Sequence, residues 1–194
     1  MRAFVAVELP DEARAALQNL QQTLAESQAD VAWVKPQNLH VTMRFLGEIA
    51  DGQRRDIETL LSRIAAGTTP FQTSFSMLGA FPSVSAPRVI WVGIEEGKEH
   101  LEKIAKELEG GLRSLKIPSE DRAFVAHVTL GRVRSSKNRR ELVERMRSVA
   151  WKAPDPFVSD HLTLFQSTLT PAGSIYTLIN KAAFSSEFGV RSSE

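Results

Sequence analysis

The chain has 194 residues, which is enough for one large domain or two small lobes with a buried core. Hydrophobic residues make up 42% of the sequence and charged residues 24%, as in an ordinary soluble globular protein. The formal net charge is only +1, which excludes an overall positive field that would drive non-specific binding along nucleic acid.

Cysteine is absent, so disulfides and cysteine catalysis are excluded. The opening segment Met1–Glu8 becomes polar too early for a signal peptide. No apolar run approaches the roughly 18 residues that a membrane span requires. We therefore expect a cytoplasmic protein that does not bind a membrane.

The first half of the chain alternates short apolar runs with amphipathic segments. Period-two patterns predict strands, and apolar residues at helical spacing predict helices. Asp51 is positioned to cap a helix that ends near Gly67. In chain order we predict a strand at 4–9, a helix at 11–27, a strand at 31–34, a strand that starts at His40 and ends at Gly47, and a helix at 51–66.

The second half continues the same alternation. A strand at 70–78 is expected to bury one face, which includes Met77, and a loop rich in Pro and Ser follows at 81–87. The pair Gly110-Gly111 is expected to end the regular part of the third helix. The remaining predictions are a strand at 88–94, a helix at 97–108, a strand that starts at His127, a helix at 137–149, and strands near 157–166 and 174–183.

The order of these elements is that of one unit used twice. We predict an α+β fold of two pseudo-symmetric lobes, each a mostly antiparallel sheet backed by helices, with an active-site cleft between them. Residues 1–184 are expected to form a single two-lobed domain, and residues 185–194 a flexible C-terminal tail.

The same short motif, His-Val-Thr, stands in two of the predicted strands. It comprises His40 and Thr42 in the first copy and His127 and Thr129 in the second. Because side chains of a strand alternate between faces, each copy offers an imidazole and a hydroxyl on one face and apolar residues on the other. Two such strands facing each other would make a cleft with two histidines and two hydroxyls.

This set of groups suits the cleavage of a phosphoester. Near neutral pH one histidine can deprotonate an attacking water while another protonates the departing oxygen. Hydroxyls can donate hydrogen bonds to the phosphate oxygens, and an arginine offers a planar cationic fork. The sequence has no HExxH, closely spaced HxH or GxxxxGK[ST] motif, and we expect neither a metal nor another cofactor.

A third copy of the pattern weakens an argument from the motif alone. His161 and Thr163 repeat the spacing, but the first basic residue after them is Lys181. Arg44 and Arg132, in contrast, follow the first two copies closely. We therefore interpret His161 as a solvated strand histidine.

The two arginines differ in strand parity. Strict alternation places Arg44 on the face of His40 but Arg132 on the face opposite His127, unless Gly131 marks a bulge or the end of the strand. Basic residues that follow the second motif form either a solvated face or a surface that steers RNA; they are Arg132, Arg134, Lys137, Arg139 and Arg140. Tryptophans are expected in the core; they are Trp33, Trp91 and Trp151.

The sequence resembles the two-histidine (2H) phosphoesterases, and among them the 2′-5′ RNA ligase-like RNA 2′,3′-cyclic phosphodiesterases. The likeness extends over nearly the whole chain and is carried by Arg2–Pro10, Trp33–Thr42, Gly79–Trp91, Phe124–Leu130 and Ser167–Leu169, with Gly173 and Tyr176. Two small departures are Ala126, where many members have proline, and Gly131, where alanine is frequent.

The resemblance implies roles for individual residues. His40 and His127 would be the catalytic pair, and Thr42, Thr129 and Arg132 would bind the phosphate. Strict alternation would place Arg132 on the face opposite His127, but the resemblance implies that it reaches the phosphate, and we follow the resemblance. Arg44, which is a weaker candidate, stands where members commonly have a basic residue.

The resemblance implies a metal-independent hydrolase that opens a terminal 2′,3′-cyclic phosphate on RNA or oligonucleotide ends and leaves a 2′-phosphate. Our hypothesis takes His127 as the proton acceptor that activates water and His40 as the proton donor to the 3′-oxygen. The opposite division stays open, because the two strands are nearly equivalent chemically. We expect a monomer that grips an RNA end. The alternatives are 2′-5′ RNA ligation by the reverse reaction and a non-catalytic RNA-end binding module.

Overall fold

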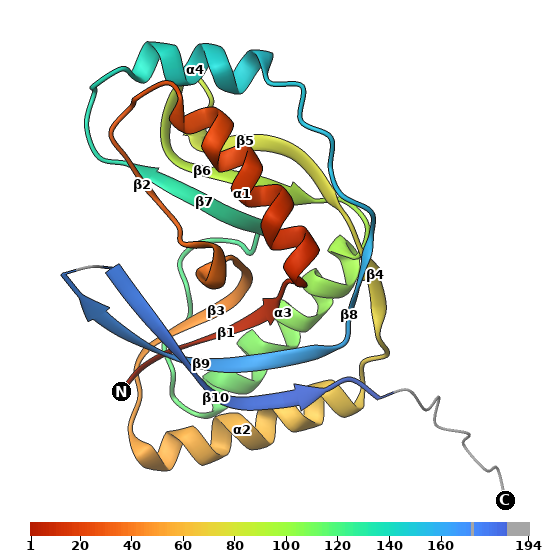
Figure 1. Ribbon diagram of the computed structural model, residues 1–194. Helices are drawn as coiled ribbons and strands as arrows, with labels where there is room; N and C mark the ends of the chain where they lie inside the picture. Colours follow the sequence, from red (N-terminus) through yellow and green to blue (C-terminus); the bar gives the residue numbers. More distant parts are fainter. Residues whose placement is uncertain (172, 186–194) are drawn as a thin grey trace, which may run out of the picture.

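The computed structural model describes residues 1–171 and 173–185, which form an α+β fold (Figure 1). Its helices are α1 (Asp11–Ala25), the short 3-10 helix η1 (Pro36–Asn38), α2 (Asp51–Ala66), α3 (Lys98–Ser114) and α4 (Arg139–Ser148). Its strands are β1 (Arg2–Glu8), β2 (Val31–Trp33), β3 (His40–Glu48), β4 (Phe71–Thr73), β5 (Phe75–Ser83), β6 (Ala86–Ile94), β7 (His127–Val133), β8 (Phe157–Ser159), β9 (His161–Thr170) and β10 (Gly173–Ala183).

An antiparallel sheet in the order β10-β9-β1-β3-β7-β6-β5 runs through the molecule, and β2 pairs with the far end of β7. At its middle, β3 and β7 are joined only through the pair Val41 and Val128. We call β10, β9, β1 and β3 lobe 1, and β2, β7, β6 and β5 lobe 2. The structure thus confirms the predicted α+β fold of two mostly antiparallel lobes.

Each lobe combines strands from both halves of the sequence. Lobe 1 pairs β1 with β9, and lobe 2 pairs β6 with β7. The short strands β4 and β8 form a separate pair that also joins the halves. Helices α2 and α3 lie against lobe 1, and α1 and α4 against lobe 2 (Figure 1). Neither half of the chain therefore builds a lobe alone.

The face of the sheet that the helices cover holds the core. Val41, Met43, Val128 and Leu130 are all buried there. The amide of Gln21, itself buried, donates hydrogen bonds of 2.8 Å to the backbone carbonyls of Val34 and Leu130, which ties α1 to the end of β7. Because side chains alternate, the residues between these apolar positions point to the opposite, open face of the sheet.

The segment 70–87 differs from its prediction in three ways. The single strand at 70–78 divides at Ser74 into β4 and β5, which belong to different sheets. A register irregularity between Phe75 and Leu78 turns Met77 outward, and its exposed fraction is 73%. The expected loop at 81–87 is also wrong, because β5 and β6 form a hairpin in which Pro82 pairs with Pro87. Pro82 is tolerated because β5 is an edge strand, and Pro87 because it precedes Val89, where the pairing of β6 with β7 begins.

The third helix is longer than predicted. It passes through both glycines and ends at Ser114. A Cβ atom on Gly111 would lie 2.4 Å from a side-chain carbon of Leu60 in α2. Gly111 therefore allows α2 and α3 to approach closely, rather than ending the helix.

Three smaller differences concern element ends. Asp51 is the first residue of α2 rather than its cap, and the backbone N–H of Ala50 donates to the side chain of Gln53. The strand near 157–166 divides at Asp160 into β8 and β9. The predicted tail lies outside the described residues except for Ser185, whose backbone N–H donates to the carbonyls of Ala65 and Thr68. No helix in the described ranges is long and apolar enough to cross a membrane.

Candidate active site

The two His-Val-Thr motifs meet at the junction of the lobes. Val41 lies opposite Val128 in an antiparallel pair, and both are fully buried. This register brings Thr42 toward His127 and Thr129 toward His40, all on the open face. The structure therefore brings together four of the residues that the sequence singled out.

The two imidazoles are held in matching orientations. Nδ1 of His40 lies 2.7 Å from the carbonyl oxygen of Asn38, and Nδ1 of His127 lies 2.6 Å from that of Val125. A carbonyl can only accept, so each Nδ1 carries the proton and each Nε2 is left as a proton acceptor. Both carbonyls stand two residues before their histidine. The backbone before each motif therefore fixes both imidazoles in the same tautomer, with the proton on Nδ1.

Aromatic rings surround both histidines. The ring of His40 stacks on Phe4 with centroids 4.9 Å apart and meets the edge of Tyr176 at 5.5 Å. His127 meets Phe81 at 5.3 Å and Trp91 at 6.0 Å. Trp91 thus lies on the open face beside the motif, rather than in the core as predicted.

Burial lowers the pKa of both histidines. For His40 it lowers the pKa to about 4, against the opposing effect of the hydrogen bond to Asn38, and the charge of Arg14 lowers it further. Burial also lowers the pKa of His127, and the charge of Arg132 acts in the same direction. Both imidazoles are therefore neutral at pH 7 in the free protein.

A β-bulge in β7 brings Arg132 to the site. Ile90 pairs with Gly131, but the next residue, Trp91, pairs with Thr129, so β7 contains one extra residue at this point. Leu130 and Gly131 are both buried, and alternation resumes with an exposed Arg132 on the side of His127. The bulge that the sequence required for this placement is present.

A matching bulge in β3 turns Arg44 away from the site. Val5 pairs with Arg44 and Ala6 with Thr42, which leaves Met43 as the extra residue. Arg44 is only 5% exposed, and its Nε donates to Glu109 Oε2 at 2.9 Å. The prediction that Arg44 shares the face of His40 is therefore wrong, because the bulge reverses the alternation on which it rested.

Phe45 occupies the position that corresponds to Arg132. Each residue follows its motif histidine by the same interval, just after the bulge. Phe45 is 52% exposed, and its ring lies 6.0 Å from that of Phe4, on the open face. Sequence reasoning missed this residue, because only the strand register reveals the two bulges.

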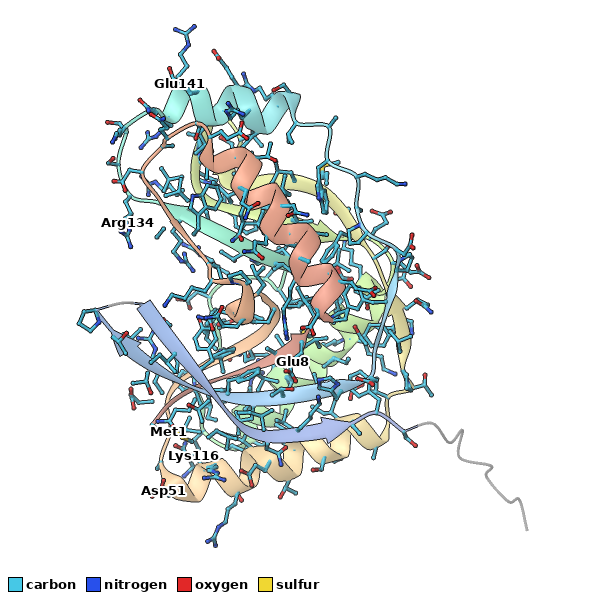
Figure 2. All side chains as sticks on the ribbon, in the orientation of Figure 1. Met1, Glu8, Asp51, Lys116, Arg134 and Glu141 are labelled. Carbon is cyan, nitrogen blue, oxygen red and sulfur yellow. The ribbon has the colours of Figure 1, made fainter. Side chains whose placement is uncertain are left out.

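The third copy of the motif, His161 and Thr163, binds a carboxylate of the protein itself. Nε2 of His161 lies 2.8 Å from Glu8 Oε2, and the hydroxyl of Thr163 donates to the same oxygen at 2.7 Å. Lys181 Nζ is 3.5 Å from it, and the other ring nitrogen of His161 contacts Asp160. His161 is therefore not a solvated histidine as predicted, since the pairing of β9 with β1 places it against Glu8 (labelled in Figure 2).

Burial alone would raise the pKa of the Glu8 carboxyl. The hydrogen bonds from Thr163 and His161 and the charge of Lys181 outweigh this effect and lower the pKa. Glu8 thus carries a full negative charge at neutral pH, and its partners lie on β9 and β10.

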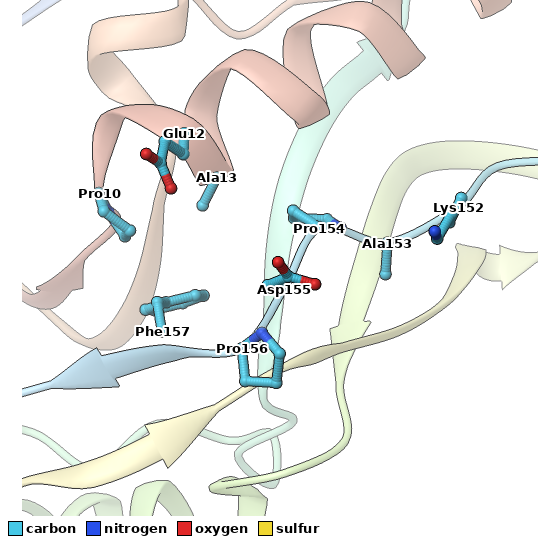
Figure 3. Close-up of a pocket in the computed structure, with 9 residues that line it drawn as sticks. All are labelled: Pro10, Glu12, Ala13, Lys152, Ala153, Pro154, Asp155, Pro156 and Phe157. Atoms are coloured by element: carbon cyan, nitrogen blue, oxygen red, sulfur yellow. The ribbon is translucent and has the colours of Figure 1, made fainter.

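Two hollows open on the surface near the start of α1. The larger, about 420 Å³ and shown in Figure 3, lies between Pro10–Ala13 and residues 152–157 and contains no histidine. The smaller, about 140 Å³, adjoins His40 and is lined by Glu8, Arg14, Gln37, Asn38, Leu39, Phe165 and Tyr176. Among the described residues no group of three or more His, Cys, Asp and Glu is arranged to hold a metal ion. The chemistry-bearing side chains thus gather at the smaller hollow and the lobe junction.

The model of the LigT-like phosphoesterase family matches the chain twice, at residues 7–91 and 92–176. The chain belongs to this family. Each match contains one of the two motifs that meet at the lobe junction. The repeat that the sequence predicted is therefore the repeat of the family.

Curated relatives and a solved structure agree with this assignment. The chain is 37% identical to the RNA 2′,3′-cyclic phosphodiesterase of Aquifex aeolicus over 153 residues, which are 77% of this chain and 79% of the relative. It is 34% identical to the protein of the same name from Methanothermobacter thermautotrophicus over 177 residues, 91% and 95% of the two chains. The crystal structure of TT0787 from Thermus thermophilus matches with a TM-score of 0.79 and 29% identity, over 95% of this chain and 98% of that one.

Proposed function

We propose that this LigT-like phosphoesterase hydrolyses terminal 2′,3′-cyclic phosphates of RNA or oligonucleotides to 2′-phosphomonoesters. The observation that carries the proposal is the pair of imidazoles at the lobe junction, each with Nδ1 bound to a backbone carbonyl, so that Nε2 is the nitrogen that can take up a proton, and each with a threonine two residues on. The names of the curated relatives point to the same reaction.

The proposed reaction is a single displacement at phosphorus. Water attacks the phosphorus while Nε2 of His127 takes its proton. The bond from phosphorus to the 3′-oxygen breaks, and Nε2–H of His40 gives that oxygen a proton. The product is a 2′-phosphomonoester with a free 3′-hydroxyl. His40 must therefore be protonated before this step, and the negative charge of the bound phosphate favours that form by raising its pKa.

Thr42 fits this change of protonation. In the free protein its hydroxyl lies 2.9 Å from Nε2 of the neutral His40 and donates to it. Once Nε2 carries a proton, the imidazole donates instead, and the hydroxyl of Thr42 is released to donate to a phosphate oxygen. Thr129 and Arg132 would hold the phosphate from the side of β7.

The test is release of phosphomonoester from a short RNA with a 2′,3′-cyclic phosphate end, measured in excess EDTA. We expect turnover by the unmodified protein and a loss of roughly 100- to 10,000-fold in both His40→Ala and His127→Ala. His100→Ala is the matched control, because His100 is exposed on α3 and, among the described residues, its ring stacks only on Phe71. Loss of turnover in EDTA would contradict the metal-independent scheme. Absence of turnover by a correctly folded protein would favour a binding module.

A further inference from the structure

Arg14 is an arginine beside the proposed site that no motif marks. It stands on α1 and lines the hollow of about 140 Å³ that also contains His40. Its only hydrogen bond within the described part of the chain is from Nη1 to Asp11, at 3.2 Å, and Asp11 is 98% exposed. Such an exposed ion pair is weak and exchanges easily for another anion.

The guanidinium of Arg14 also has a donor without a partner. Its Nε is buried and makes no hydrogen bond among the described residues. A buried N–H without a partner is unfavourable, so the protein alone does not satisfy all the donors of this guanidinium.

The charges around the hollow favour an anion at Arg14. The one carboxylate that lines it, Glu8, is held by Thr163, His161 and Lys181 on the side of β9 and β10. Gln37 and Asn38 are neutral, and Phe165 and Tyr176 offer aromatic surface. Arg14 lies close enough to His40 for its charge to act on the imidazole. An anion at Arg14 would therefore be a near neighbour of the group bound at His40.

We propose that Arg14 binds the phosphate on the 5′ side of the nucleoside that carries the cyclic phosphate, with that nucleoside lying in the hollow against Tyr176 and Phe165. This inference rests on the proposed function and specifies its substrate class. A guanidinium fork suits a phosphodiester, and aromatic rings suit a ribose or base. The enzyme then distinguishes an oligonucleotide end from an isolated nucleoside 2′,3′-cyclic phosphate.

The experiment compares adenosine 2′,3′-cyclic phosphate with the same compound carrying a 5′-phosphate. In Arg14→Gln we expect kcat/KM for the 5′-phosphorylated substrate to fall by about tenfold or more, as for the loss of a hydrogen bond to a charged group. For the substrate without a 5′-phosphate we expect a change within about twofold. Arg14→Lys, which keeps the charge but not the fork, should retain part of the preference.

Arg55→Gln is the matched control, because it removes the same charge from an exposed position. Arg55 is on α2, which lies on the face of the sheet opposite the motif histidines. This variant should leave both values of kcat/KM unchanged. Equal losses with both substrates in Arg14→Gln would overturn the inference, because Arg14 would then act through His40 or the fold. The inference would also be overturned if Arg14→Gln kept the preference of the unmodified protein for the 5′-phosphorylated substrate.

A binding measurement separates this inference from the proposed reaction. Dissociation constants of the two compounds are measured by calorimetry in His127→Ala and in His127→Ala combined with Arg14→Gln. We expect the 5′-phosphate to strengthen binding about tenfold only where Arg14 is present. If the unmodified protein hydrolyses neither these compounds nor the short RNA with a 2′,3′-cyclic phosphate end, the proposed reaction fails, while this difference in binding still upholds or overturns the role of Arg14.

Discussion

His40 and His127 are both neutral at pH 7 in the free protein, whereas the proposed reaction requires one of them to donate a proton. Because of this requirement, we expect kcat/KM to depend on pH. The competent form has one imidazole protonated and the other neutral, and it is most populated between the two pKa values. Burial holds the pKa of His40 at about 4 and that of His127 below its ordinary value of 6.5.

We therefore expect kcat/KM, which reports the free enzyme, to follow a bell with its maximum below pH 6.5 and to fall as the pH rises further. The profile of kcat should lie at higher pH, since a bound phosphate raises the pKa of both imidazoles. Steady-state kinetics from pH 4 to 9 at constant ionic strength tests both points. A kcat/KM that rises continuously from pH 5 to 9 would contradict the proposed roles.

At the scale of single elements, the contact between α2 and α3 depends on one of two adjacent glycines. In Gly111→Ala the new Cβ would meet Leu60 at 2.4 Å, so we expect a loss of about 1–3 kcal/mol in the free energy of unfolding. In Gly110→Ala the new atom meets nothing within 4 Å, and the better helix former should stabilise the protein by about 0.5–1 kcal/mol. Urea titration of both variants measures the difference. Equal effects would contradict the packing role of Gly111.

Much of the fold could be predicted from periodicity. The strands that carry the motifs and the positions of the four helices follow from apolar spacing, which depends on local sequence. Gly110 and Gly111 misled the prediction of α3, because a glycine that ends a helix and one that permits close packing look alike in sequence. The hairpin at Pro82 and Pro87 was missed because proline predicts a loop unless the strand is known to be an edge.

The site was predictable where it depends on alternation within one strand. His40, Thr42, His127 and Thr129 lie together as the motif indicates. Arg44 was misplaced because a bulge is a property of strand pairing, and the pairing of β1 with β3 is not visible in either strand alone. The same holds for His161, whose partner Glu8 is distant in sequence, and for Arg14, which only the fold brings beside His40.

At the scale of the whole molecule, each lobe contains strands from both halves of the chain, since β9 and β10 lie in lobe 1 and β5 and β6 lie in lobe 2. We therefore expect the two lobes to unfold together. All three tryptophans report on lobe 2, because Trp33 is in β2, Trp91 is in β6, and Trp151 packs against Phe75 of β5 with centroids 6.1 Å apart. Far-ultraviolet circular dichroism reports on both lobes. We expect the urea transitions followed by fluorescence and by circular dichroism to coincide, as for one cooperative domain. Separate midpoints would show that the lobes unfold independently.

In the proposed reaction, Phe45 and Arg132 would together favour a single product. A cyclic phosphate has two similar ester bonds, and a pocket with full two-fold symmetry would accept the ring either way round and release a mixture of regioisomers. The apolar side chain at one bulge and the cationic one at the other remove that symmetry, because Arg132 would attract the charged phosphate oxygens. The proposed substrate would then bind in one orientation, and the same ester oxygen would depart in every turnover.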